Sequence, residues 1–120
     1  MRRQSKKTAA REAEAKPILD ALKAEVGYCE KCGPSKRRLE VHEIARGASR
    51  GRARGKRFAT LILCWQCHRD VDDTKAWPFA RQLGLLRTSR PDDYDLDAFN
   101  ALMGRGPQRI TEADIAEWSE

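Results

Sequence analysis

Four cysteines of this chain stand in two short pairs that could share one metal ion. The pairs are Cys29-x-x-Cys32 and Cys64-x-x-Cys67, with 31 residues between them. Each pair can offer two thiolates from one tight turn, and two such turns complete a tetrahedron around zinc. The pattern therefore predicts a structural zinc site. Two disulfides, a redox-active cysteine pair and a four-cysteine iron site are the alternative interpretations of the same thiols.

Both histidines of the chain lie near these cysteines in sequence. His42 and Glu43 are adjacent in the run LEVHEIARG between the two pairs, and His68 directly follows Cys67. Imidazole and carboxylate groups can bind divalent cations and can transfer protons near neutral pH. A shared zinc ion would bring the stretch after residue 32 beside the stretch before residue 64. These three side chains are therefore candidates for one site.

The charge of the chain is divided unevenly between its two halves. Residues 1–68 hold 17 Lys and Arg against 7 Asp and Glu, a balance of +10, whereas residues 69–120 hold 7 against 11, a balance of −4. Lys and Arg side chains that contact phosphates release condensed counterions, so a basic half of this kind indicates a nucleic-acid partner. A membrane surface or an acidic protein is the other kind of partner that such a charge suits.

The length and composition allow only a modest core. The chain has 120 residues, of which 40% are hydrophobic and 35% charged, and bound zinc would add its binding free energy to folding. We divide the chain into a basic flexible arm (1–16), a zinc-stapled core (17–75) and a helical extension packed on that core (76–120). No apolar run reaches the roughly 20 residues that span a bilayer, and the charged N-terminus lacks a hydrophobic secretion signal. We expect a cytoplasmic protein without a membrane partner.

The pattern of apolar residues and turn residues predicts an α+β chain. Strands are expected over residues 38–44 and 58–64, and helices over 17–26, from about 65, after 78, over 95–103 and over 111–118. Thr111 and Asp114 should form a capping box at the start of the last helix. Residues 45–57 are rich in Gly, Arg and Lys and are expected to form a flexible loop without buried side chains.

The order of these motifs resembles the HNH endonucleases with the ββα-metal fold, in their zinc-ribbon form. The matching motifs are YCEKCG (28–33), LEVHEI (39–44) and LILCWQCHRD (61–70), and the resemblance covers roughly residues 27–75. It implies a small ββα-metal core and the hydrolysis of DNA phosphodiester bonds with a catalytic divalent cation.

The resemblance also implies roles for single residues. In the V-H-H-I or V-D-H-I strand of the family, the first polar residue binds the catalytic cation and the second is the general base. These positions fall on His42 and Glu43, and the other cation ligand falls on His68. The asparagine of the family falls on Ala59 or Thr60, so this chain departs from the pattern both there and at the base.

The two departures can be linked by one physical argument. A histidine base needs a hydrogen bond that holds its tautomer, which is the task that the resemblance assigns to the asparagine, whereas a carboxylate has no tautomer to fix. With Glu43 as the base, the asparagine would have no task. A nuclease that has lost its activity would show the same two changes, so an inactive zinc-ribbon DNA-binding or adaptor protein is the alternative.

The mechanism that we expect is phosphodiester hydrolysis with one cation. His42 and His68 would hold the cation beside a phosphate oxygen, where it stabilises the leaving 3′ oxygen, and Glu43 would take a proton from the attacking water. Adjacent strand residues point to opposite faces, so a bulge or a twist is expected near residues 42–44.

The identity of the catalytic cation depends on a third ligand. The candidates are Mg²⁺, Mn²⁺, Ni²⁺ and Zn²⁺. Two histidines alone favour one of the transition ions, unless a carboxylate from Asp70, Asp72 or Asp73 joins them.

The basic loop is expected to contact the phosphate backbone of DNA without reading base edges. The residues in question are Arg46, Arg50, Arg52, Arg54, Lys56 and Arg57. Small nucleases that resemble this chain are common in phages and prophages, so phage packaging or replication proteins are candidate partners and the cytoplasm of a bacterial host is a candidate location.

Each candidate residue also has a purely structural interpretation. His42 could be a buried strand histidine, and His68 could replace Cys67 as a zinc ligand or cap a helix. Glu43 could form an ion pair with Arg46 or another basic neighbour, and the basic loop could be merely solvated. A protein-interaction module, working through the helical C-terminal half, is the third hypothesis.

Overall fold

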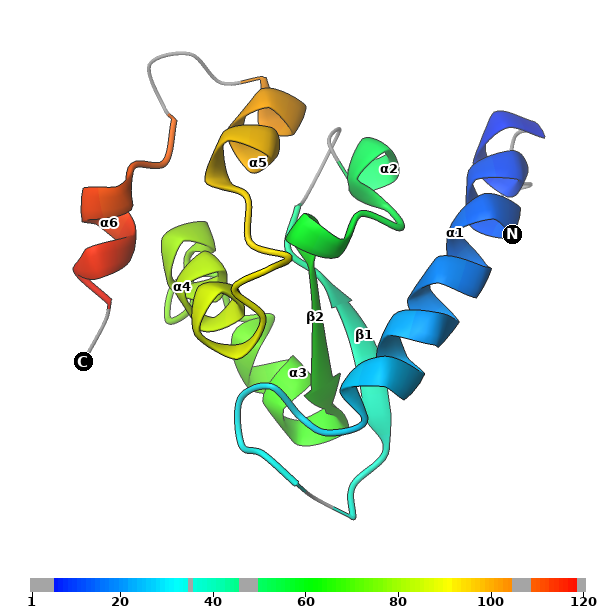
Figure 1. Ribbon diagram of the computed structural model, residues 1–120, viewed down its shortest axis with the longest axis horizontal. Coiled ribbons are helices and arrows are strands. Elements are labelled where there is room, and N and C mark those ends of the chain that lie inside the picture. The colour runs from blue at the N-terminus through cyan, green and yellow to red at the C-terminus, as the bar shows by residue number, and fades with distance from the viewer. Residues whose placement is uncertain (1–5, 35, 46–49, 105–108, 119–120) are drawn as a thin grey trace.

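The computed structural model describes residues 6–34, 36–45, 50–104 and 109–118 and has the α+β fold that the sequence predicts (Figure 1). Along this described part, the elements are α1 (Lys6–Val26), β1 (Leu39–Glu43), α2 (Arg50–Ala53), η2 (Arg57–Ala59), β2 (Thr60–Cys64), α3 (Trp65–Val71), α4 (Phe79–Ser89), α5 (Leu96–Met103) and α6 (Glu112–Ala116). None of the helices described is both long and apolar enough to cross a bilayer.

The two strands form an antiparallel pair between two groups of helices. Their register runs without interruption from Leu39 opposite Cys64 to Glu43 opposite Thr60, so the expected bulge near residues 42–44 is absent from these five pairs. Helix α1 lies on one side of the strands, and α3 and α4 lie on the other (Figure 1). Strand β2 is buried along its whole length, which agrees with its apolar sequence TLILC.

The core lies mainly on the side of α3 to α6. Leu61 and Leu63 of β2 belong to a buried cluster that also contains Leu83 and Phe99 from the C-terminal helices. Ile62 alternates with them along the strand and is equally buried, so it faces the opposite side, where α1 packs. The extension is thus part of the same core as the strands.

The first helix begins earlier than the sequence analysis predicts. We placed its start at Pro17 and treated residues 1–16 as an arm, but α1 begins at Lys6 and continues through Pro17. The run KKTAAREAEAK is rich in Ala, Glu and Lys, which have high helix propensity and outweigh the one backbone donor that a proline lacks. Residues 1–5 lie outside the described part, and the division into three segments stays a prediction.

The segment 45–57 is also more ordered than we predicted. It contains α2 and the start of η2, and the side chain of Ala53 is buried. Gly55 has a φ of +81° in the turn that follows α2. A Cβ atom there would lie only 3.2 Å from the Cβ atom of Ala15 in α1, so the glycine allows both the turn and the close approach. Residues 46–49 lie outside the described part.

The helices of the extension begin and end where local signals predict. Thr111 Oγ1 accepts a hydrogen bond from the backbone N–H of Asp114 (3.2 Å), and the Thr111 N–H donates to Asp114 Oδ2 (2.9 Å), so the predicted capping box is confirmed. Helix α5 ends at Gly104, whose φ is +65°. These termini fix the lengths of the helices that cover the strands.

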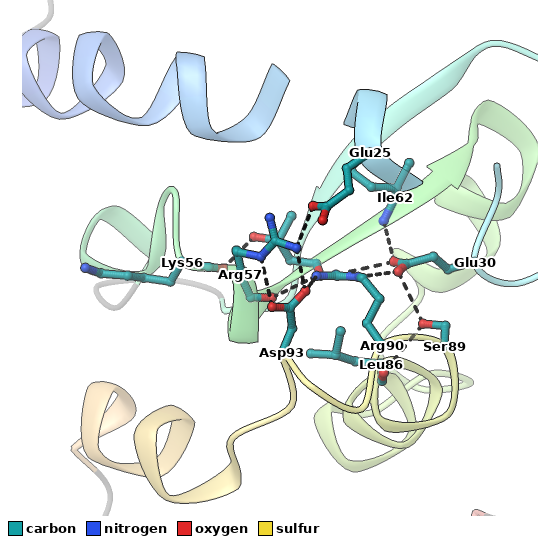
Figure 2. A network of polar contacts seen from close by, with 10 residues as sticks. Glu25, Glu30, Lys56, Arg57, Ile62, Leu86, Ser89, Arg90 and Asp93 are labelled. Atoms are coloured by element: carbon teal, nitrogen blue, oxygen red, sulfur yellow. Dashed lines mark hydrogen bonds and ion pairs between the residues drawn. The ribbon is translucent and has the colours of Figure 1, made fainter. Parts of the chain in front are cut away.

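A buried ion pair joins the first cysteine pair to the extension (Figure 2). Glu30 lies between Cys29 and Cys32, and its side chain is 0% exposed. One carboxylate oxygen accepts a hydrogen bond from the backbone N–H of Ile62 at 2.7 Å, and the other pairs with Arg90, which is 10% exposed. The carboxylate therefore connects the cysteine turn, β2 and the end of α4.

Arg90 extends this network to a second acid (Figure 2). It donates to the carbonyl oxygen of Thr60 and, at 2.7 Å, to Asp93. Asp93 also accepts two hydrogen bonds from Arg57, at 2.9 and 3.0 Å. The Arg57 guanidinium, with help from Arg90, lowers the pKa of the Asp93 carboxyl although burial opposes this. The stabilisation is therefore present above the ordinary pKa of an aspartate and is lost as acid protonates the folded protein.

The Arg90→Met substitution should lower the free energy of unfolding by about 3–5 kcal/mol, because it leaves the buried Glu30 carboxylate without its charge partner. Urea unfolding of the metal-loaded protein measures this. Lys16→Met is the matched control: Lys16 pairs with Asp20 at 2.7 Å, but the two side chains are 74% and 57% exposed, so its loss should leave the free energy of unfolding almost unchanged. Equal losses for the two variants would show that the buried network does not hold the extension.

Candidate functional site

The four cysteines meet at one end of the strand pair. Their sulfur atoms all lie within 4.8 Å of one another, and the sulfurs of Cys32 and Cys64 are 3.8 Å apart. Cys64 ends β2, and Cys67 lies in the first turn of α3. All four are free thiols, and three of them are buried. The cluster could hold a structural metal ion such as zinc, as the spacing of the cysteines predicts.

Backbone amides point at the sulfur atoms from within each cysteine turn. The N–H groups of Cys32 and Cys67 donate to the sulfurs of Cys29 and Cys64, at 3.4 and 3.5 Å. Burial opposes ionisation of the Cys29 thiol, but backbone amides, that of Cys32 foremost, lower its pKa to about 7. Burial instead raises the pKa of the Cys67 thiol. A metal ion would therefore find one thiol that ionises near neutral pH and would have to displace a proton from the other.

A second group of potential metal ligands lies beside the strands. His42 of β1, His68 of α3 and Asp72 offer ligand atoms that all lie within 4.8 Å of one another. The two imidazole rings meet edge to face, with 5.1 Å between their centroids. His68 and Asp72 are four residues apart at the end of α3, so they project from the same face of the helix. Of the three acids that we considered as a third ligand, Asp72 is the one in this group.

Glu40 orients His68. Its Oε1 lies 2.9 Å from Nδ1 of His68, and its other oxygen accepts from Arg38 at 2.8 Å. The hydrogen bond from His68, followed by that from Arg38, lowers the pKa of the Glu40 carboxyl. A carboxylate can only accept, so Nδ1 of His68 is the donor. A cation bound by His68 would then meet Nε2, as is usual for metal-binding histidines. Sequence analysis missed this role, although Glu40 and His42 are two residues apart in β1 and therefore lie on the same face of the strand.

A residue of the C-terminal extension, Gln82, orients the side chain of His42. Its Nε2 lies 2.6 Å from Oε1 of Gln82 in α4, and both side chains are buried. Sequence analysis did not single out Gln82. A glutamine forty residues away carries no local signal that relates it to His42.

Glu43 lies in the same recess as the three potential ligands. The recess has a volume of about 300 Å³ and is lined by Val41, His42, Glu43, Ala45, Arg54, His68 and Asp72. The Glu43 side chain is 7% exposed and forms an ion pair with Arg54. Glu43 is the last residue of β1, so its side chain can line the same recess as His42 although the strand has no bulge there. The pair agrees in kind with the structural interpretation of Glu43, with Arg54 as the basic neighbour.

The two residues that stand where the resemblance expects an asparagine, Ala59 and Thr60, do not contribute to the recess. Ala59 and Thr60 are both buried. Thr60 lies opposite Glu43 in the strand register, but its hydroxyl donates to the carbonyl oxygen of Lys56 at 2.8 Å. Neither residue lines the recess.

The basic residues that we predicted to contact DNA have different positions. Arg54 lines the recess, whereas Arg57 belongs to the partly exposed network around Asp93 (Figure 2). Two hydrogen bonds to Asp93 and a contact with Glu25 raise the pKa of Arg57 further above its usual range. Arg57 therefore contributes to the fold. Its side chain is still 38% exposed, so its predicted contact with DNA stays a prediction.

The remaining basic residues flank the turn after α2. Arg52 and Lys56 are exposed and can meet a phosphate backbone. Arg46 and the side chain of Arg50 lie outside the described part, so the prediction for them is unchanged.

No protein-family model matches the chain, and neither a curated protein nor a solved structure matches it significantly.

Substitution of Cys67 should abolish metal binding at the cysteine cluster, whereas substitution of His68 should preserve it, because His68 faces Glu40 and the recess. We expect Cys67→Ala to lose the thiolate-to-cobalt absorption of Co²⁺-substituted protein and His68→Ala to keep it at full intensity. A Co²⁺ titration followed in the visible range measures both. The reverse result would make His68 the fourth ligand of the zinc site.

Proposed function

We propose that this protein is a cation-dependent DNA endonuclease with a ββα-metal core. The observation that carries the proposal is the convergence of His42, His68 and Asp72 beside Glu43 in one recess. The order of two antiparallel strands and a helix, with a cysteine cluster at their end, supports it. So does the resemblance of the sequence motifs to those of HNH endonucleases.

The donor set suits a divalent transition ion. Two imidazole nitrogens and one carboxylate oxygen form a mixed set of ligands that favours Mn²⁺, Ni²⁺ or Zn²⁺. The carboxylate also allows Mg²⁺ to bind. A cation held there would act as a Lewis acid on a phosphate oxygen and stabilise the charge that develops on the leaving 3′ oxygen.

Glu43 is the residue that we assign as the general base. Its carboxylate lies beside the ligands in the recess, where it can accept a proton from a water molecule that attacks the phosphorus atom. Arg54, its ion-pair partner, is placed to contact the same phosphate group. When a phosphate draws the guanidinium away, the carboxylate becomes available to the water.

The surface beside the recess suits the phosphate backbone of DNA. Arg52 and Lys56 stand two residues before and after Arg54 in the chain, and both are exposed. Lys and Arg contacts with phosphates position DNA without reading its sequence. Partners from phage packaging or replication, and a cytoplasmic location, stay predictions from the resemblance.

The zinc-loaded protein should nick supercoiled plasmid in the presence of Mn²⁺, Ni²⁺, Zn²⁺ or Mg²⁺. Removal of a ligand by His42→Ala, His68→Ala or Asp72→Asn should abolish nicking. Loss of the base in Glu43→Gln should slow it by about 100- to 10,000-fold. Asp70→Asn is the matched control, because Asp70 is exposed on α3 and does not line the recess, and it should cleave at the wild-type rate. A wild-type rate for Glu43→Gln would remove Glu43 as the base.

An inactive DNA-binding protein is the second candidate, and the ion pair between Glu43 and Arg54 favours it, because the pair occupies the proposed base. This candidate shares the salt-dependent affinity of the nuclease, with a slope of about −0.9 in log K against log salt for each phosphate contact. It differs in one result: the wild-type protein would bind DNA but would not cleave it with any of the four cations.

A further inference from the structure

Gln82 holds a bridging position between the extension and the proposed cation site. Its side chain is 0% exposed within α4. The carboxamide Nε2 donates a hydrogen bond to the carbonyl oxygen of Trp77 at 2.8 Å, and Oε1 lies 2.6 Å from Nε2 of His42. Both ends of the amide therefore have a hydrogen-bond partner.

These two contacts determine the orientation of the amide. A carbonyl oxygen can only accept, so the NH₂ group of Gln82 must face Trp77 and its oxygen must face His42. The amide oxygen in turn can only accept, so Nε2 of His42 must carry a proton. In the neutral imidazole, the lone pair is then on Nδ1.

We propose that Gln82 is a positioning residue for the cation site: it fixes the tautomer and the ring orientation of His42, so that Nδ1 is the ligand nitrogen. The inference rests on the proposed function, because it deepens the role of the same site. Both histidines would then be arranged in the same way: a neighbouring side chain accepts a hydrogen bond from one ring nitrogen, and the other nitrogen binds the metal. Glu40 does this for His68 through Nδ1.

The use of an amide for the buried histidine follows from its surroundings. His42 is 1% exposed and His68 is part exposed. A carboxylate beside His42 would add a charge to a buried position, which is costly, whereas a neutral amide accepts the same hydrogen bond without one. The amide is itself held by Trp77, so it cannot rotate to present its NH₂ group.

The inference also assigns a function to the extension. Gln82 is adjacent to Leu83, which is fully buried in the core cluster together with Leu86 of the same helix. The packing of α4 therefore sets the position of the amide relative to β1. Residues 76–120 then complete the cation site, in addition to covering the core.

The state of His42 can be read directly from the ¹⁵N and ¹H correlations of its ring in the full, zinc-loaded chain. The chain has two histidines, and a His68→Ala variant assigns the signals. We expect His42 to carry its proton on Nε2, and we expect added Zn²⁺ to shift the Nδ1 signal. A proton on Nδ1 of wild-type His42 would overturn the inference without the use of any Gln82 variant.

Two substitutions of Gln82 then separate positioning from packing. Gln82→Leu keeps the approximate volume but accepts no hydrogen bond, so His42 should become a mixture of tautomers and the affinity for the second Zn²⁺ should fall by about 10- to 100-fold. Burial favours the neutral form of a glutamic acid at this position. In Gln82→Glu, the neutral acid can donate to the Trp77 carbonyl and accept from Nε2, so this variant should retain the wild-type tautomer and most of the affinity. Thr88→Ala is the control, because Thr88 is exposed on the same helix and its substitution should leave both the tautomer and the Zn²⁺ affinity unchanged.

The outcomes distinguish this inference from the proposed function. Equal Zn²⁺ affinity in wild-type and Gln82→Leu proteins, or an equal loss in Thr88→Ala, would overturn the positioning role even if the wild-type protein cleaves DNA. Retained Zn²⁺ binding and the expected tautomers without cleavage would support the role of Gln82 and contradict the nuclease. A wild-type protein in which Zn²⁺ shifts neither histidine signal would overturn both.

Discussion

The recess depends on the meeting of the two cysteine turns, residues 29–32 and 64–67. Cys64 is both a member of this cluster and the last residue of β2, opposite Leu39, so an ion bound there would fix the strand register from one end. A slip of one residue would turn His42 to the other face of the strands. Helix α3 begins directly after Cys64, so the same constraint places His68 and Asp72 beside β1. The four cysteines, which could hold a metal ion, therefore help to position a second group of potential metal ligands.

The extension secures this arrangement through two buried polar contacts. Arg90 neutralises Glu30 within the first cysteine turn, and Gln82 meets His42 at the recess. Both contacts start from α4 or its end, and both reach a residue of the core that could not be buried without a partner. The acidic C-terminal half also supplies Asp93, which binds Arg57. Part of the basic charge that suggests a DNA surface is thus paired with acidic side chains of the molecule itself.

Local patterns in the sequence were enough to predict the strands, the capping box at Thr111 and the meeting of the cysteines, because each depends on neighbours in the chain or on metal chemistry. The choice of Asp72 was also within reach, since it stands one helical turn after His68. Contacts made by tertiary packing were not: neither Gln82 beside His42 nor Arg54 beside Glu43 has a signal in the sequence. The early start of α1 shows that helix propensity can outweigh a single proline.

An anomalous-difference map from crystals of the zinc-loaded protein soaked in Mn²⁺ is the most direct test of the second cation site. We predict zinc among the four cysteines and a separate manganese peak within bonding distance of Nδ1 of His42, Nε2 of His68 and a carboxylate oxygen of Asp72. Zinc at the cysteines with no manganese peak between these side chains would contradict it and would leave the two histidines as structural residues.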